Sequence, residues 1–262
     1  MTTESLRKKR ALIAGSTQGI GLAIAKELAA MGADCTLISR NPESLEKALM
    51  QLPQNGGQDH RYLVADFNHY EQVRTVITEE VKRYQYAILV NNSGGPAAGP
   101  VFEAPTEEFL SAFQQHLICN QILVQAIVPG MKAVGYGRIV NIISTSVKIP
   151  LKNLGVSNTI RGAVASWAKT MSNELAPFGI TVNNVLPGAT ATARLEGIVQ
   201  NKMNQTGQSK EAAESSMIDQ IPMKRFGKPE EIAAVAAFLT SPAASYLTGV
   251  SIPVDGGRTG CL

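Results

Sequence analysis

The fold of this chain is decided by one stretch near its start, Ala14-Gly15-Ser16-Thr17-Gln18-Gly19-Ile20-Gly21. It directly follows the short apolar run Ala11-Leu12-Ile13, and Ile20, Ile24 and Leu28 then recur at four-residue spacing. A strand, a turn poor in side chains and an amphipathic helix are therefore expected in that order. Such a turn lets backbone N–H groups approach a phosphate, and the helix N-terminus adds partial positive charge there. The stretch predicts a nucleotide-binding turn rather than an ordinary flexible one.

Short apolar runs alternate with longer helical patterns along the rest of the chain, which is typical of a parallel sheet with crossover helices. We expect strands near residues 10–14, 35–39, 60–64, 87–91, 137–143, 180–186 and 249–254. The fourth and fifth of these runs are nearly continuous in apolar residues, as expected for strands covered on both faces. The predicted fold is α/β, a doubly wound parallel sheet of the Rossmann type with about seven strands and helices on both faces. One such domain would span residues 1–262.

Composition narrows the class of protein without identifying it. A chain of 262 residues with 44% hydrophobic content suits one α/β domain of ordinary size. A net charge of +3, from 24 basic and 21 acidic residues, is too small to indicate a nucleic-acid partner. Cys35, Cys119 and Cys261 are scattered, so neither a disulfide framework nor a metal site is indicated. No export signal and no apolar stretch of about 18 residues is evident, so we expect a cytoplasmic protein without a membrane partner.

Three further motifs each follow one of the expected strands. They are Asn91-Asn92-Ser93-Gly94-Gly95, Pro187-Gly188 and Val254-Asp255-Gly256-Gly257. Together with the glycine turn they resemble the short-chain dehydrogenase/reductase family, from about residue 10 to residue 257. The segment Pro222–Glu231 resembles the one before the last helix in 3-oxoacyl-acyl-carrier-protein reductases. The resemblance implies an oxidoreductase acting on a small-molecule carbonyl or alcohol. It also implies a homo-oligomer, a tetramer, that uses the helices after the fourth and fifth strands and the edge of the last strand.

The end of the second strand indicates which cofactor is used. In dinucleotide sites an acidic residue about 20 positions after the glycine turn binds the ribose 2′-hydroxyl, whereas a basic residue accommodates a 2′-phosphate. The second strand ends Ser39-Arg40-Asn41, without an acid. Arg40 therefore predicts NADP(H), because a guanidinium can meet the phosphate bidentately. The alternative is a solvent-exposed arginine at a strand end.

The resemblance assigns further cofactor contacts. Asp66-Phe67, after the third strand, matches the position that contacts adenine, although an Asp at a strand end is also an ordinary helix cap. Asn92, Ser93 and Gly94 are implied in cofactor binding, as are Pro187 and Gly188, and Thr192 matches the threonine that contacts the nicotinamide amide. The stretch from about 190 to 220 resembles the substrate lid of the family.

The catalytic region departs from the family pattern. Family members use a Tyr four residues before a Lys on one helix, a Ser at the end of strand five and an Asn in the preceding helix. Ser144 matches the serine, but thirteen residues later Ser157 stands where the tyrosine should be, and Arg161 replaces the lysine. His116 stands at the asparagine position if that helix carries no gap.

These replacements change what the site can do. A serine hydroxyl cannot be tuned toward a neutral pKa as a tyrosine can. Arg161 keeps its charge, so it can bind ribose hydroxyls or stabilise an anion but cannot relay a proton. The proton must then come from His116, whose ordinary pKa suits the task, or from water held by Ser144 and Ser157. His116 is equally well interpreted as a partly buried structural histidine.

Three hypotheses follow. The first is an NADP(H)-dependent oxidoreductase of the 3-oxoacyl reductase type with an atypical proton relay. The second is a non-redox enzyme resembling halohydrin dehalogenases, which carry an arginine at the lysine position but keep the tyrosine and have lost the nucleotide site. The third is a cofactor-binding sensor or structural subunit without turnover. The intact glycine turn and Arg40 disfavour the second, and the first is our main prediction.

Overall fold

A seven-stranded parallel sheet forms the centre of the computed structural model, which describes residues 5–54 and 57–261. The strand order is β3-β2-β1-β4-β5-β6-β7, and every neighbouring pair is parallel. The strands are β1 (Arg10–Ala14), β2 (Asp34–Ser39), β3 (Arg61–Val64), β4 (Ile88–Asn91), β5 (Gly137–Ile142), β6 (Ile180–Pro187) and β7 (Ser251–Val254). The predicted fold class is confirmed, and all seven expected strands are present with bounds shifted by at most two residues.

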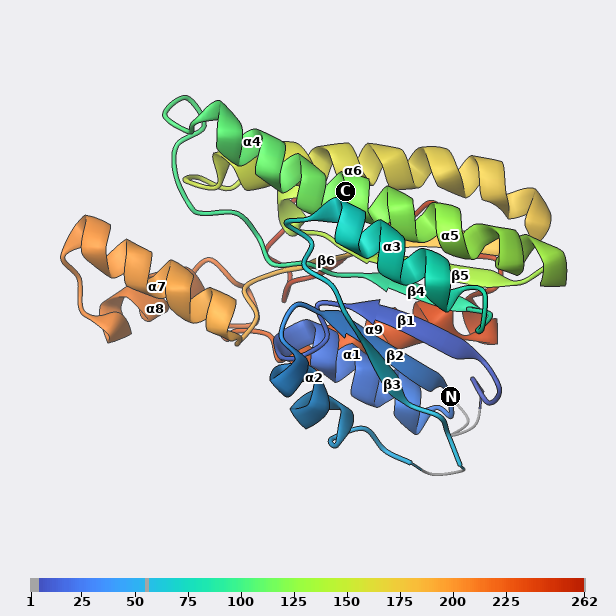
Figure 1. Ribbon diagram of the computed structural model, residues 1–262. Coiled ribbons are helices and arrows are strands. Elements are labelled where there is room, and N and C mark those ends of the chain that lie inside the picture. The colour runs from blue at the N-terminus through green and yellow to red at the C-terminus, as the bar shows by residue number, and fades with distance from the viewer. Residues whose placement is uncertain (1–4, 55–56, 262) are drawn as a thin grey trace.

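Helices cover both faces of the sheet (Figure 1). They are α1 (Gly19–Ala30), α2 (Pro42–Leu49), α3 (Tyr70–Glu80), α4 (Thr106–Phe113), α5 (Cys119–Val134), α6 (Gly155–Leu175), α7 (Ala193–Thr206), α8 (Lys210–Ile218) and α9 (Pro229–Thr240). One apolar core joins α1 and α9 to the sheet, with Ile24 and Ile232 buried in it. A second core joins α3, α5 and α6 to the other face, around Ile77 and Leu123. Helices α7 and α8 project away from both layers.

The helix formed by α4, a π-helical turn (η1, Gln114–Ile118) and α5 runs without a break over Thr106–Val134. By length and composition alone this helix could cross a membrane, although no membrane-spanning stretch was expected from the sequence. Its apolar residues have another explanation, because α5 buries Ile122, Leu123 and Ile127 in the core that it shares with α3 and α6. A core helix passes the same compositional test, so the span is weak evidence for a membrane.

A row of side-chain amides holds the middle strands in register. Asn91 of β4 donates from Nδ2 to Oδ1 of Asn141 of β5 at 2.8 Å, and Asn141 donates in turn to Asn184 of β6 at 3.0 Å. Asn184 then donates to the hydroxyl of Ser251 of β7 at 3.0 Å. Each pair is also a directly opposed pair in the sheet. Asn91 Oδ1 has no hydrogen-bond partner among the described residues, but each neighbouring pair in the row is bonded, so a one-residue slip of any strand would break these bonds.

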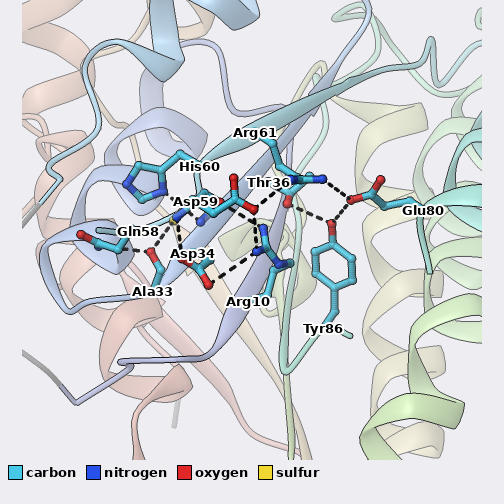
Figure 2. A network of polar contacts seen from close by, with 11 residues as sticks. Arg10, Ala33, Asp34, Thr36, Gln58, Asp59, His60, Arg61, Glu80 and Tyr86 are labelled. Atoms are coloured by element: carbon cyan, nitrogen blue, oxygen red, sulfur yellow. Dashed lines mark hydrogen bonds and ion pairs between the residues drawn. The ribbon is translucent and has the colours of Figure 1, made fainter. Parts of the chain in front are cut away.

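A separate polar network lies at the amino ends of β1, β2 and β3 (Figure 2). Asp59 accepts hydrogen bonds from Arg10 at 3.0 Å and from Arg61 at 2.8 Å. Glu80 lies 3.9 Å from Arg61 and accepts a hydrogen bond from the Tyr86 hydroxyl at 2.8 Å. The charges in this network are paired, and it fastens the starts of the strands at the edge opposite the loops described next.

The chain reverses its direction of winding between β1 and β4, which are neighbours in the sheet. It leaves β1 toward β2 and β3 on one side, then returns to β4 and continues to β7 on the other. The loops after β1 and β4 therefore separate at the carboxyl edge of the sheet. In open α/β sheets this crevice is where ligands bind.

Candidate active site

The glycine turn after β1 depends on its three glycines, Gly15, Gly19 and Gly21. Gly15 and Gly19 have φ values of +57° and +55°, a region that disfavours side chains. A Cβ at Gly21 would lie 2.1 Å from the carbonyl oxygen of Gly15. Asn92, after β4, donates from Nδ2 to that same oxygen at 3.0 Å, which fastens the turn to the neighbouring strand. Helix α1 begins at Gly19, so its free N–H groups and its positive end face the crevice.

A cleft of about 1970 Å³ opens at the carboxyl edge. Its walls are the loops after β1, β2, β3, β4, β5 and β6 together with α7 and α8. Most residues predicted for the site line it: Gly15, Thr17, Gln18, Gly19, Ile20, Arg40, Asp66, Phe67, Asn92, Ser93, Gly94, Ser144, Ser157, Arg161, Pro187, Gly188 and Thr192. Ser16, Gly21 and His116 do not line the cleft. Ser16 is fully buried, and Gly21 supports the turn from behind.

Arg40 lies exposed at the end of β2 and lines the cleft. None of the ion pairs among the described residues involves it. An unpaired guanidinium beside the glycine turn fits a phosphate on the adenosine ribose. Asp66 accepts hydrogen bonds from the backbone N–H and the side chain of Asn68, both at 2.9 Å. The residue that caps α3 is His69, so Asp66 closes the turn before the helix while its side chain borders the cleft.

Ser144, Ser157 and Arg161 all line the cleft, and Arg161 contacts the carbonyl of Ile142, two residues before Ser144. Ser144 follows β5, and its Oγ accepts a hydrogen bond from the N–H of Ser146 at 3.1 Å. Ser157 and Arg161 lie one turn apart on α6 and are both largely buried. The two hydroxyls and the guanidinium can therefore act on one bound molecule.

Arg161 links three elements. Its Nη1 donates to the carbonyl of Ile142 at the end of β5 at 3.0 Å, and its Nη2 donates to the carbonyl of Ser93 after β4 at 3.3 Å. Burial, and then the nearby Arg194, lower the pKa of Arg161 to about 10. The side chain is therefore a cation at neutral pH and cannot exchange a proton there.

His116 lies in the π-helical turn η1 and is only 1% exposed. Its Nδ1 is 2.5 Å from the hydroxyl oxygen of Ser93, and its Nε2 has no partner. Burial lowers the pKa of His116 to about 2, and the charges of Arg161 and Arg194 act in the same direction. The expectation that His116 has the pKa of an ordinary histidine is therefore wrong. The imidazole is neutral, and its hydrogen bond positions Ser93 rather than supplying a proton near pH 7.

Arg194 is a cleft residue that sequence reasoning missed. It lies in the first turn of α7, and its Nη2 donates to the carbonyl of Pro96, after β4, at 2.7 Å. The contact joins residues 98 positions apart, so α7 and the loop after β4 meet beside the cleft. In the sequence Arg194 is one basic residue among many polar ones, and no local pattern sets it apart.

Comparisons with known proteins identify the family. The family model described as "Enoyl-(Acyl carrier protein) reductase" matches residues 14–259. The NADPH-dependent reductase BacG of Bacillus subtilis is 33% identical over 254 residues, which cover 96% of this chain and 98% of the relative. The chain belongs to the short-chain dehydrogenase/reductase family. Another family member, the 3-oxoacyl-[acyl-carrier-protein] reductase FabG of Pseudomonas aeruginosa, is 32% identical over 257 residues, covering 97% of this chain and 98% of the relative.

A solved structure extends the likeness to the whole chain. The L-sorbose reductase from Gluconobacter frateurii, complexed with NADPH and L-sorbose, is 30% identical and superposes with a TM-score of 0.92, covering 100% of both chains. The fold of this short-chain dehydrogenase/reductase therefore matches that of a family member solved with its nucleotide.

Proposed function

We propose that the protein is an NADPH-dependent reductase that interconverts a carbonyl and an alcohol, similar to 3-oxoacyl reductases, with an atypical proton relay. The observation that carries the proposal is the convergence of Ser144, Ser157 and Arg161 on the wall of a cleft that also contains the glycine turn and Arg40. Relatives described as NADPH-dependent, and one solved with NADPH, support the choice of cofactor. The unpaired Arg40 supports it independently.

The residues have distinct tasks in this proposal. The glycine turn holds the diphosphate, Arg40 the 2′-phosphate, and Arg161 the hydroxyls of the nicotinamide ribose. When bound, NADPH supplies a hydride to the carbonyl carbon. Ser144 and Ser157 donate hydrogen bonds to the carbonyl oxygen, and Arg161 stabilises the negative charge that develops on it.

The proton follows a route different from that of the family. Because His116 is neutral and lies outside the cleft wall, we assign the proton to a water molecule held by Ser144 and Ser157. The water protonates the alkoxide, and bulk solvent neutralises the hydroxide that remains. Without an acid poised near neutral pH, this step is slower than with a tyrosine.

Single-turnover oxidation of bound NADPH by ketones, aldehydes and 3-oxoacyl thioesters tests the proposal. We expect slow hydride transfer in the wild type and faster transfer in the Ser157→Tyr, Arg161→Lys double variant. If neither protein oxidises NADPH with any carbonyl compound, while both bind it, the chain is a cofactor-binding protein without turnover. The replaced tyrosine and lysine positions favour that second candidate.

We further propose that residues 1–262 form one domain in which α7 and α8 act as a substrate lid, and that the protein forms a homo-oligomer, a tetramer. Strand β7 lies at an edge of the sheet, and Tyr246, just before it, is fully exposed. Leu110 and Phe113 on α4 are also exposed apolar residues. Light scattering at micromolar concentration tests the assembly, which a monomer would contradict.

A cytoplasmic location is part of the proposal, and Cys35, Cys119 and Cys261 are unbridged.

A further inference from the structure

Four guanidinium groups line the cleft, those of Arg40, Arg161, Arg194 and Arg258, together with the carboxylates of Asp66, Glu196, Glu214 and Glu230. Neither Arg161 nor Arg194 is paired with one of these carboxylates. Arg161 is buried at the cleft wall, and Arg194 borders the cleft from the first turn of α7. None of the ion pairs among residues 5–54 and 57–261 involves either side chain. Their hydrogen bonds go to the backbone carbonyls of Ile142, Ser93 and Pro96. Carbonyl oxygens satisfy N–H groups but do not neutralise the charge.

The two cations lie close enough to affect each other. Arg194 lowers the pKa of both Arg161 and His116, and the cleft walls desolvate Arg194 itself enough to lower its own pKa. Arg161 is buried whereas Arg194 is exposed, so the repulsion falls mainly on Arg161, and an anion between the two guanidinium groups would offset it. The charge arrangement therefore indicates an anionic ligand at this end of the cleft.

The loop after β4 fixes the position of the Arg194 side chain. Its Nη2 is held by the Pro96 carbonyl at 2.7 Å, and a Cβ on Gly95 would lie 3.1 Å from the same nitrogen. Because Gly95 has no side chain, the Arg194 guanidinium has room to lie beside it. Arg194 borders the same cleft as Ser144 and Ser157, so an anion that it binds lies in the cleft that holds the reacting carbonyl.

We propose that Arg194 determines substrate specificity by binding a carboxylate of the substrate, so that the preferred substrates are oxo acids. The inference rests on the proposed reductase activity for the identity of the ligand. A guanidinium pairs with a carboxylate through two parallel hydrogen bonds, which fixes orientation as well as charge. A phosphate of the cofactor offers the same chemistry, and the experiment separates these two sources.

The first measurement compares 2-oxo and 4-oxo acids with their methyl esters as substrates. For the wild type we expect higher kcat/KM with the acids. Arg194→Gln should lower kcat/KM for the acids about 30-fold, the loss expected for a hydrogen-bonded charge pair, while the esters change less than about 3-fold. Lys148→Gln is the matched control, because it removes one positive charge from an exposed position outside the cleft wall. It should leave both substrate classes unchanged.

Binding measurements separate this proposal from the proposed activity. Calorimetry should show that aliphatic carboxylates bind the NADP⁺-loaded wild type, that the corresponding amides do not, and that Arg194→Gln abolishes the difference. Gly95→Ala, whose Cβ would lie 3.1 Å from the guanidinium, should weaken carboxylate binding less than Arg194→Gln does, because the flexible side chain can shift by a few tenths of an ångström. Carboxylate binding without turnover of any carbonyl compound would overturn the reductase and keep the anion site. An Arg194→Gln variant that weakens NADPH binding and affects acids and esters alike would overturn the inference, because Arg194 would then pair with the cofactor.

Discussion

Replacing Gly21 by alanine tests the close packing of the nucleotide-binding turn. A Cβ at this position would lie 2.1 Å from the carbonyl oxygen of Gly15, whereas real Cβ atoms do not approach other atoms within 3.0 Å. Helix α1 and the turn must therefore separate by about 0.9 Å, and both partners are backbone, so no side chain can rotate away. The displacement moves the N–H groups that would hold the cofactor diphosphate.

The expected magnitude combines two opposing effects. Alanine in a helix is favoured over glycine by about 1 kcal/mol, while forced overpacking costs about 1–3 kcal/mol or more when backbone must move. We expect Gly21→Ala to lower the free energy of unfolding by about 2 kcal/mol and the melting temperature by about 6 °C. Losing one or two charge-assisted hydrogen bonds should raise the Kd for NADPH by about 10- to 100-fold.

Gly197→Ala provides the matched control. Gly197 is also helical, in α7, but a Cβ there meets no atom within 4 Å. This variant should be unchanged or more stable by up to about 1 kcal/mol, with NADPH affinity retained. Calorimetric melting and fluorescence titration with NADPH measure both effects. Equal melting temperatures for the two variants, or a Kd for Gly21→Ala within twofold of the wild type, would refute the reasoning.

Three further predictions concern the cofactor, the hydroxyls and the buried histidine. Arg40→Gln should raise the Kd for NADPH about tenfold and leave the Kd for NADH unchanged in calorimetry; loss of affinity for both would show that Arg40 does not select the 2′-phosphate. Ser144→Ala should lower single-turnover hydride transfer more than Ser157→Ala, because the proposed mechanism assigns Ser144, two residues after β5, to the developing oxyanion; the reverse order would contradict that assignment. Because burial lowers the pKa of His116 from 6.5 to about 2, the unfolded state binds more protons than the folded state below pH 6.5. Stability that is present above pH 6.5 is therefore lost as the pH falls, by about 1 kcal/mol between pH 7 and pH 5.5, and His116→Asn should remove this slope in urea unfolding. If stability falls equally with pH in both proteins, the imidazole has the same pKa folded and unfolded, and His116 is then accessible to water.

The turn, the strands and the place of Arg40 at the end of β2 could be predicted from the sequence because each depends on neighbouring residues. The apolar run before Gly15, the helical spacing after it and the basic residue at the end of β2 are local patterns, and the parallel sheet brings the strand ends to one edge. The assignment of Ser157 and Arg161 to the tyrosine and lysine positions of the family stays a prediction from the sequence.

Only the tertiary structure decided the electrostatics of the cleft. The pKa of His116 is lower than that of an ordinary histidine, because the fold buries the side chain and brings Arg161 and Arg194 near it from distant parts of the chain. The amide row through Asn91 and Asn141 likewise depends on strand register, which no local pattern reports. Desolvation and Coulomb interactions depend on distances in space. The charge state of a side chain, and therefore the ligands it can bind, is set only when remote segments pack together.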